Sequence, residues 1–317
     1  MTADTPSVGH DRSSFWFGPW IQAARPIAFP MILVPLLIGQ AMAFRYGNTF
    51  GWVLLGYSIA FGALYQLYLL YTNDHADEAI DKTNHQHWLS GGSRVLPEGK
   101  LTGDQLLAGS RVALVVLVVL VGSLAVFADR PLMLVASVLA VALCWAYNRP
   151  PMQWSYRGRG EVLQGMGCGV LLPLIGYYLQ VGTVFGFPWP TLVPLFLIFY
   201  AGNMVTALPD FASDVNGGKR TFPVRHGQAR ARWTILGTLA VAFASLPVVS
   251  SVLPAWILAG IARPSVAILV GVVVSGLVKR ADVAEFPQCL AFVNWISVSQ
   301  AWFLCAWISA LFWESTL

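Results

Sequence analysis

The amino-acid sequence predicts an all-α fold, a multi-pass membrane bundle of about nine transmembrane helices around a central cavity. Of its 317 residues, 56% are hydrophobic and 11% are charged, and the mean hydropathy is +0.64. A chain of this composition cannot cover a water-soluble surface of ordinary polarity. The long apolar runs, such as residues 112–126, are apolar at nearly every position, whereas the strands of a membrane barrel alternate in polarity.

Nine segments reach the length of about 17 to 25 apolar residues that a helix needs to cross a bilayer. They cover residues 27–44, 52–72, 111–128, 131–147, 161–181, 190–209, 233–251, 254–278 and 289–313. Residues 1–26 contain no pattern typical of a cleaved signal peptide, so we predict an N-terminal tail over 1–26 and a single transmembrane domain over 27–317. The four cysteines lie inside predicted helices at unrelated spacings, which favours apolar core residues over a metal site or a disulfide framework.

The basic residues predict the orientation of the bundle. With nine helices, nearly all of the 19 lysine and arginine residues fall on the side of the N-terminal tail, and only Arg45, Arg130 and Arg263 lie elsewhere. Because basic residues accumulate on the cytoplasmic face, we expect a cytoplasmic N-terminus and a C-terminus outside, in the cytoplasmic (inner) membrane. The net charge of +4 reflects this face, which attracts anionic membrane lipid and indicates no nucleic-acid partner.

Two acidic clusters lie on the predicted cytoplasmic side, at the ends of the second and sixth segments. The first consists of Asn73, Asp74, Asp77 and Asp81, and the second of Asp210 and Asp214. Both contain the spacing Asp-x-x-x-Asp, and both are followed by a Gly-Gly pair and a basic residue. A parallel internal repeat of about four helices would bring the two clusters face to face across the cavity.

The spacing of these carboxylates predicts a metal site. On a helix that continues past residue 71, Asp74, Asp77 and Asp81 share one face, because positions i, i+3 and i+7 are neighbours. Carboxylates packed this closely repel one another unless a cation lies between them. Oxygen ligands of this kind suit Mg²⁺, which completes its coordination with water and phosphate oxygens, and two such sites could hold a diphosphate. The alternative, that aspartates only cap helix ends or solvate a loop, explains a single aspartate better than two matching clusters.

Basic residues beside the clusters could stabilise a departing diphosphate. Arg94 follows Gly91-Gly92-Ser93, and Lys219 and Arg220 follow Gly217-Gly218, where glycine lets backbone and side chain approach an anion closely. The sequence has no Walker loop and no dinucleotide-binding fingerprint, so we expect no nucleotide cofactor. Asn203, two turns before Asp210, could line the cavity or form a hydrogen bond between helices.

These residues resemble a known family. Asn73-Asp74-x-x-Asp77-x-x-x-Asp81 is similar to the first aspartate-rich motif of the UbiA superfamily of intramembrane prenyltransferases, and Asp210-x-x-x-Asp214 with Gly218-Lys219-Arg220-Thr221 is similar to its second. Residues 91–96 and 209–227 are most similar to the 1,4-dihydroxy-2-naphthoate (MenA-type) branch of menaquinone synthesis. His75-Ala76 departs from that branch, where an aromatic pair is common.

The resemblance implies Mg²⁺-dependent transfer of a prenyl group from a prenyl diphosphate to a small aromatic acceptor, 1,4-dihydroxy-2-naphthoate or a related quinone precursor. The metal ligands would be Asn73, Asp74, Asp77, Asp81, Asp210 and Asp214, the catalytic cations Arg94, Lys219 and Arg220, and the substrate-binding residues these cations with Asn73 and Asn203. Two alternatives remain open. One is prenyl transfer to a non-aromatic acceptor on the same scaffold. The other is a cation-coupled transporter, whose carboxylates should lie nearer the bilayer midplane at broken helices.

Overall fold

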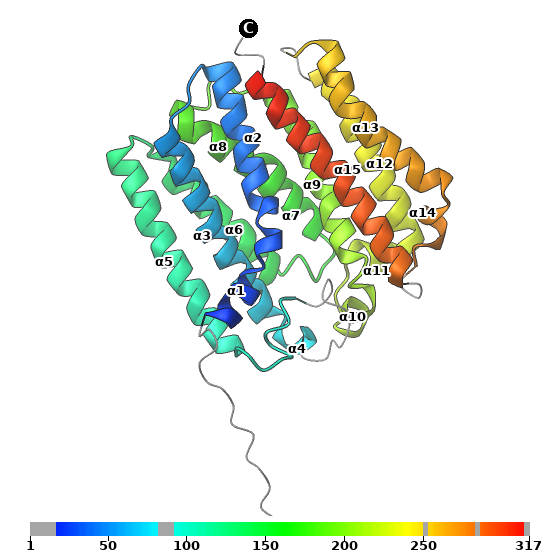
Figure 1. The fold of residues 1–317 in the computed structure, drawn as a ribbon. Coiled ribbons are helices and arrows are strands. Elements are labelled where there is room, and N and C mark those ends of the chain that lie inside the picture. The colour runs from blue at the N-terminus through cyan, green and yellow to red at the C-terminus, as the bar shows by residue number, and fades with distance from the viewer. Residues whose placement is uncertain (1–16, 82–91, 250–252, 283–285, 314–317) are drawn as a thin grey trace, which may run out of the picture.

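The computed structural model describes residues 17–81, 92–249, 253–282 and 286–313, and within these ranges all regular structure is helical (Figure 1). The predicted all-α fold is confirmed. The long helices are α2 (Pro30–Gly47), α3 (Trp52–Ala76), α5 (Gly103–Phe127), α6 (Leu132–Asn148), α9 (Leu192–Ala207), α12 (Gln228–Val249), α13 (Ala255–Val274) and α15 (Phe286–Trp313). The shorter helices are α1 (Gly18–Ala24), η1 (Pro26–Ala28), α4 (Glu78–Asp81), α7 (Gly160–Met166), η2 (Gly167–Leu171), α8 (Leu172–Val181), η3 (Trp189–Thr191), α10 (Phe211–Asn216), α11 (Phe222–His226) and α14 (Leu277–Arg280).

The number of membrane spans agrees with the predicted nine only approximately. In the described ranges, seven helices or unbroken helix series are long and apolar enough to cross a membrane, among them the series α7–η2–α8. The segment before α2 forms an eighth span together with it, bent by 51°. The remaining predicted segment corresponds to α6, which is apolar but only 17 residues long. The structure therefore supports seven or eight spans by length, and nine if α6 also crosses.

One predicted boundary differs clearly from the structure. The third segment was expected to begin at residue 111, but α5 begins at Gly103. Thr102 caps this helix by accepting a hydrogen bond from the backbone N–H of Gln105, whose side chain accepts one from the backbone N–H of Thr102. Such a capping box favours a helix start, and the polar first two turns extend the helix beyond its apolar part.

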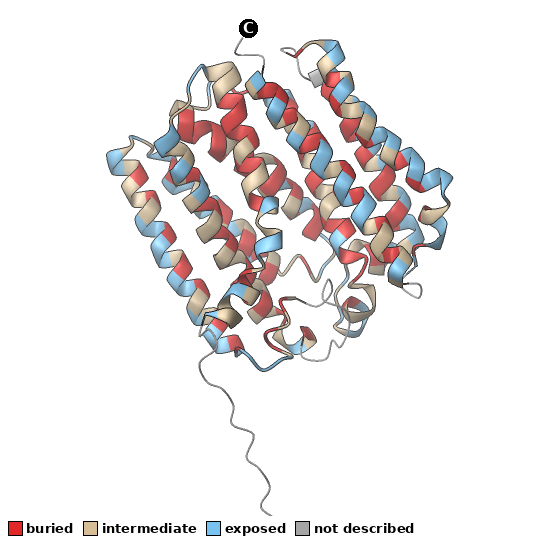
Figure 2. Ribbon diagram, viewed as in Figure 1, coloured by how far each residue is buried: buried red, intermediate tan, exposed pale blue. Residues whose placement is uncertain are grey.

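The helices enclose a central space and present apolar side chains outward. α2 packs against α8 and α15, α3 against α5, and α9 against α7 and α12. The outer face of α5 exposes Val112, Val115 and Val119, as the exposed stretches along this helix in Figure 2 show. Contiguous exposed apolar surface on long apolar helices is what contact with lipid tails requires. The protein is therefore an integral membrane protein.

Two helix breaks lie close to the central space. α1 ends at Ala24, and the next residue, Arg25, adopts a left-handed conformation with φ 44° and is followed by Pro26. The series α7–α8 is interrupted by the π-helical turn Gly167–Leu171 just before Pro173, whose ring nitrogen cannot donate the hydrogen bond that a regular α-helix needs there. Wide turns of this kind frequently mark functional sites.

Backbones of α2 and α8 touch at two glycines. A Cβ atom at Gly39 would lie 2.0 Å from the Pro173 carbonyl oxygen, and one at Gly176 would lie 2.1 Å from the Leu36 carbonyl oxygen. Small residues of this kind let membrane helices approach closely. We expect Gly176→Ala to lower the free energy of unfolding by about 1 to 3 kcal/mol, because no flexible side chain can yield to the added methyl group. Thermal unfolding in detergent measures this, with Gly237→Ala as the control because its Cβ would meet no atom within 4 Å.

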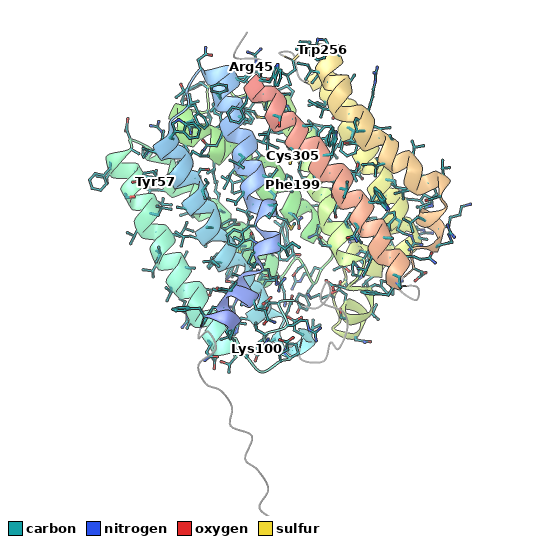
Figure 3. All side chains as sticks on the ribbon, viewed as in Figure 1. Arg45, Tyr57, Lys100, Phe199, Trp256 and Cys305 are labelled. Carbon is teal, nitrogen blue, oxygen red and sulfur yellow. The ribbon has the colours of Figure 1, made fainter. Side chains whose placement is uncertain are left out.

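A small second core forms a cap at one end of the bundle. Ala23 and Ala24 of α1 pack with Tyr71 of α3 and with Val95 and Leu96 of the loop before α5. The rings of Trp20 and Tyr71 pack edge to face, with their centroids 5.5 Å apart. This cap lies at the end of the molecule where Lys100 is labelled in Figure 3, opposite Arg45 and Trp256, and it holds the loop that carries Ser93 and Arg94 beside the end of α3.

Candidate active site

The two acidic clusters meet in one small polar cavity at the capped end of the bundle. The cavity has a volume of about 120 Å³. The predicted site residues that line it are Asn73, Asp77, Asp81, Asn203, Asp210, Asp214 and Lys219. The first three come from α3, from the junction between α3 and α4, and from α4; the others come from α9, from the start and body of α10, and from the turn after it. Most of the predicted metal ligands therefore lie together, although they are far apart in the sequence.

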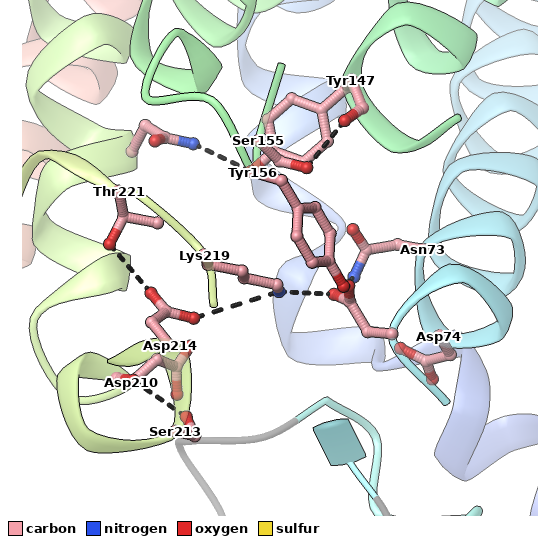
Figure 4. Close-up of polar contacts among 12 residues, drawn as sticks. Asn73, Asp74, Tyr147, Ser155, Tyr156, Asp210, Ser213, Asp214, Lys219 and Thr221 are labelled. Carbon is pink, nitrogen blue, oxygen red and sulfur yellow. Dashed lines mark hydrogen bonds and ion pairs between the residues drawn. The ribbon is translucent and has the colours of Figure 1, made fainter. Parts of the chain in front are cut away.

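Lys219 lies between the two clusters (Figure 4). Its Nζ atom is 2.8 Å from Oδ2 of Asp77 and 3.9 Å from Oδ1 of Asp214. Burial lowers the pKa of Lys219, but the charges of Asp77 and Asp214 outweigh this and raise it above the usual value of lysine. The ammonium group is thus held charged between the clusters, where a bound cation was predicted.

Tyr156 belongs to the site, although no motif in the sequence predicts it. Its hydroxyl donates a hydrogen bond to Oδ1 of Asp77 at 2.7 Å, and its ring centroid lies 5.2 Å from Nζ of Lys219. A tyrosine in a polar loop after a cis Pro150-Pro151 bond is not distinctive in sequence. In the structure it orients the carboxylate and the ammonium group together.

Two other carboxylates of the cavity, those of Asp81 and Asp214, have raised pKa values chiefly because they are buried. Burial, helped by the charges of Asp77 and Asp74, raises the pKa of Asp81 to about 7. Burial also raises the pKa of Asp214 to about 6, although Lys219 and a 3.0 Å hydrogen bond from Thr221 act in the opposite direction. Both carboxyl groups therefore change their protonation state near neutral pH.

Asp74 lies apart from the other predicted ligands. Its carboxylate contacts the guanidinium of Arg25 and the hydroxyl of Ser93, and it does not line the polar cavity. The expected common face for Asp74, Asp77 and Asp81 assumed one continuous helix, but α3 ends at Ala76 and α4 begins at Glu78. Asp74 precedes this break and faces the cap, whereas the chain changes direction after it and carries Asp81 to the polar cavity.

The predicted basic residues are divided in the same way. Arg94 lies outside the polar cavity, lines the larger cavity described below and pairs with Glu98 at 3.4 Å. Arg220 is exposed, lines neither cavity and donates its backbone N–H to the Tyr156 carbonyl. Arg25 was not among the predicted site residues but lines both cavities. Gly91, of the turn before Arg94, lies outside the described residues.

A larger and mainly apolar cavity of about 650 Å³ adjoins the polar one. Its walls come from α2, α3, α6, α7 and the π-helical turn η2, where Gly167 and Cys168 line it. The two cavities share Arg25, Asn73, Gly92, Tyr147, Asn203, Thr206 and Asp210. Asn203 fulfils both roles that were open for it, because it lines both cavities and donates hydrogen bonds to Tyr147 and Gln164.

Comparison with known proteins identifies the family. The model of the UbiA prenyltransferase family matches residues 32–296. The chain belongs to the UbiA prenyltransferase family. This UbiA protein is therefore an enzyme that transfers prenyl groups, and the family named from the motifs is confirmed.

Named relatives agree with this assignment. The chain is 25% identical over 227 residues to 1,4-dihydroxy-2-naphthoate octaprenyltransferase of Mycobacterium tuberculosis, covering 71% of this chain and 76% of that protein. It is 27% identical over 232 residues to the Escherichia coli protein of the same name, covering 67% and 70%. The fold matches a UbiA homologue from Archaeoglobus fulgidus bound to DMAPP and Mg²⁺ with a TM-score of 0.65 at 13% identity, over 93% of this chain and 99% of that one.

Proposed function

We propose that this UbiA protein transfers a prenyl group from an isoprenoid diphosphate to 1,4-dihydroxy-2-naphthoate or a related aromatic quinone precursor in a Mg²⁺-dependent reaction. One observation supports this above the others: a small cavity lined by carboxylates opens onto a large apolar cavity between the helices. A diphosphate suits the first and a prenyl chain the second. The names of the two relatives support the choice of acceptor.

The donor set suits Mg²⁺, although the cation site is not preassembled. In the described part of the chain, no three acidic, histidine or cysteine side chains converge as a ready metal site. Asn73, Asp77, Asp81, Asp210 and Asp214 nevertheless offer hard oxygen donors to one cavity, and Mg²⁺ needs only one or two carboxylates besides water and substrate phosphates. Bound there, the metal would neutralise the diphosphate oxygens and make diphosphate a better leaving group.

The protein's own residues complete the mechanism. Lys219 provides fixed positive charge for the departing diphosphate, and Tyr156 keeps Asp77 and Lys219 in place. The bond between prenyl C1 and the diphosphate oxygen breaks, its electron pair leaves with diphosphate, and an acceptor ring carbon forms the new bond. The ring then loses a proton, or carbon dioxide where that carbon carries the carboxylate. The apolar cavity excludes water that would hydrolyse the allylic cation.

The remaining candidate residues have different places in this proposal. Arg94 and Arg25 line the apolar cavity, and we propose that they contact the diphosphate as additional cations. Arg220 and Asp74 are left out, because Arg220 lines neither cavity and Asp74 anchors Arg25. The acidic residues lie at helix ends rather than at broken helices near mid-membrane, and together with the family this argues against the transporter alternative.

We also propose that the site faces the cytoplasm. α4 and α10 lie at one end of the bundle, and α15 ends at the other (Figure 1). Lysines and arginines are concentrated at the end with the acidic clusters, which is the cytoplasmic end by the positive-inside rule. The N-terminus would then be cytoplasmic and the C-terminus outside, in the cytoplasmic membrane.

Prenyl transfer in detergent tests the proposed function directly. The assay contains Mg²⁺, a labelled prenyl diphosphate and 1,4-dihydroxy-2-naphthoate, with 4-hydroxybenzoate in a parallel reaction. We expect prenylated naphthoate product and little product from the benzoate. Binding of the diphosphate without product from either acceptor would contradict the proposed acceptor, and transfer that persists in EDTA would contradict the role of Mg²⁺.

Mg²⁺ affinity should depend on pH. The raised pKa values of Asp81, about 7, and Asp214, about 6, mean that protons compete with the metal below neutral pH. The affinity should rise as these groups lose their protons and level off above about pH 7.5; below pH 6 it should fall at least about tenfold per pH unit. Calorimetric titration of the purified protein with Mg²⁺ at pH 5.5, 6.5 and 7.5 measures this, and equal affinities at the three values would contradict it.

A further inference from the structure

Three polar residues form a connected group where the polar and apolar cavities meet. Tyr147 and Asn203 line both cavities, and Gln164 lines the apolar one. They come from α6, α9 and α7, so the group ties three helices together at one point. This junction is where the first carbon of a prenyl chain must lie if its diphosphate occupies the polar cavity.

The direction of the hydrogen bonds leaves donors available to a ligand. Nδ2 of Asn203 donates to Oε1 of Gln164 at 2.9 Å and to the hydroxyl oxygen of Tyr147 at 3.2 Å. The carbonyl side of Gln164 is therefore occupied, and its buried Nε2 has no hydrogen-bond partner in the described structure. The Tyr147 hydroxyl, which accepts from Asn203, keeps its own proton to donate. A buried donor without a partner is unfavourable, so this arrangement favours the binding of a ligand that accepts a hydrogen bond.

We propose that Gln164 and Tyr147, oriented by Asn203, bind the hydroxyl oxygen of the aromatic acceptor that lies next to the ring carbon being prenylated. This inference rests on the proposed function. Two neutral donors match the lone pairs of a hydroxyl or phenolate oxygen, whereas a carboxylate would favour the guanidinium groups of Arg25 and Arg94, which line the same cavity. A hydroxyl on the acceptor ring activates the ring carbon next to the one that bears it. Holding this hydroxyl oxygen at the junction therefore places the activated carbon beside prenyl C1.

The subsite also accounts for specificity. An acceptor without that hydroxyl would leave the Gln164 amide unpaired in an apolar wall, and sites of this kind discriminate strongly against analogues that lack the hydrogen-bonding group. Asn203 is a positioning residue here, because it acts by fixing Gln164 and Tyr147. The prenyl diphosphate is bound elsewhere, by the acidic clusters and Lys219.

Steady-state kinetics of Tyr147→Phe, Gln164→Leu and Gln164→Glu test this proposal. Gln164→Glu keeps the size of the side chain and an acceptor for Asn203 but removes the amide donor, and Tyr147→Phe removes only the hydroxyl. We expect each to raise KM for 1,4-dihydroxy-2-naphthoate about tenfold or more, the loss of one hydrogen bond, while KM for the prenyl diphosphate stays within about twofold. Gln288→Leu, which removes an amide from α15 outside both cavities, is the control and should leave both constants unchanged.

Acceptor analogues distinguish the oxygen that is bound. 1,4-Dihydroxynaphthalene retains the hydroxyls without the carboxylate, and 2-naphthoate retains the carboxylate without the hydroxyls. As competitive inhibitors, the first should bind Gln164→Leu about tenfold more weakly than the unchanged protein, and the second equally well. The reverse pattern would overturn the assignment to the hydroxyl. Unchanged acceptor KM in all three variants would overturn the subsite alone, whereas absence of prenyl transfer in the unchanged protein would overturn the proposed function and this inference with it.

Discussion

Replacing Asp77 with asparagine should reduce prenyl transfer about a thousandfold or more in a protein that still folds. Asp77 has three side-chain contacts at the site: it accepts from Tyr156 at 2.7 Å and from Lys219 at 2.8 Å, and Asn73 donates to it at 3.3 Å. Asparagine keeps the shape and one oxygen but removes the charge that holds both the lysine and the proposed metal. Losing about 4 kcal/mol of transition-state stabilisation corresponds to that factor.

The control for this variant is Asp104→Asn. Asp104 is an exposed carboxylate in the first turn of α5 and lines neither cavity. Transfer is measured at saturating Mg²⁺ and prenyl diphosphate, with thermal unfolding of each variant as the test of folding. Retention of more than about a tenth of the activity in Asp77→Asn would contradict its place at the centre of the site. A comparable loss in Asp104→Asn would show that any change of charge at this end of the bundle is harmful.

The fold could be predicted from the sequence because a bilayer allows few structures. Every backbone group in lipid must be satisfied within its own segment, so each long apolar run became a helix or a broken helix. Polar extensions were less visible, as at the start of α5, where a capping box rather than hydropathy sets the boundary. The π-helical turn before Pro173 was also hidden, because proline inside an apolar run is compatible with several backbone adjustments.

The part of the site that could be predicted consists of the charged residues that form clusters in the sequence. Asp77, Asp81, Asp210 and Asp214 come together because both motifs stand at helix ends on the same side. The contributions of Tyr156 and Gln164 were missed, since a single tyrosine in a loop and a glutamine in an apolar helix carry no spacing signal. Their roles depend on which helices pack against each other, and no local motif or spacing in a single sequence predicts that packing.

Removing the ammonium group of Lys219 should destabilise the metal-free protein strongly. In Lys219→Met, Asp77 and Asp214 would remain as buried carboxylates without the cation that now lies 2.8 Å and 3.9 Å from them. Breaking a buried ion pair in this way costs about 3 to 5 kcal/mol. Because the pKa of Lys219 is raised in the folded protein, its contribution is fully present at neutral pH and is lost only as the pH rises through that value.

Two conditions should reduce this loss. Mg²⁺ with prenyl diphosphate supplies a replacement cation, so the difference in unfolding temperature between the unchanged protein and Lys219→Met should be smaller with both ligands than in EDTA. Acidic pH should also reduce the loss of stability. The pKa of Asp214 is about 6 even with Lys219 present, and it should be higher without the lysine. At pH 5.5 the Asp214 carboxyl of the variant is therefore neutral and needs no cation. The difference in EDTA should therefore be smaller at pH 5.5 than at pH 7.5.

Lys100→Met is the matched control for Lys219→Met. Lys100 also pairs with a carboxylate, Glu98, at 2.7 Å, but its side chain is 47% exposed, against 15% for Lys219. An exposed pair contributes about 0 to 1 kcal/mol, so this variant should unfold near the temperature of the unchanged protein under all conditions. If Lys219→Met behaved like Lys100→Met in EDTA, the lysine would not be the internal counterion of the two acidic clusters. If it were destabilised equally with and without Mg²⁺ and prenyl diphosphate, the metal would not share the place that the ammonium group now holds.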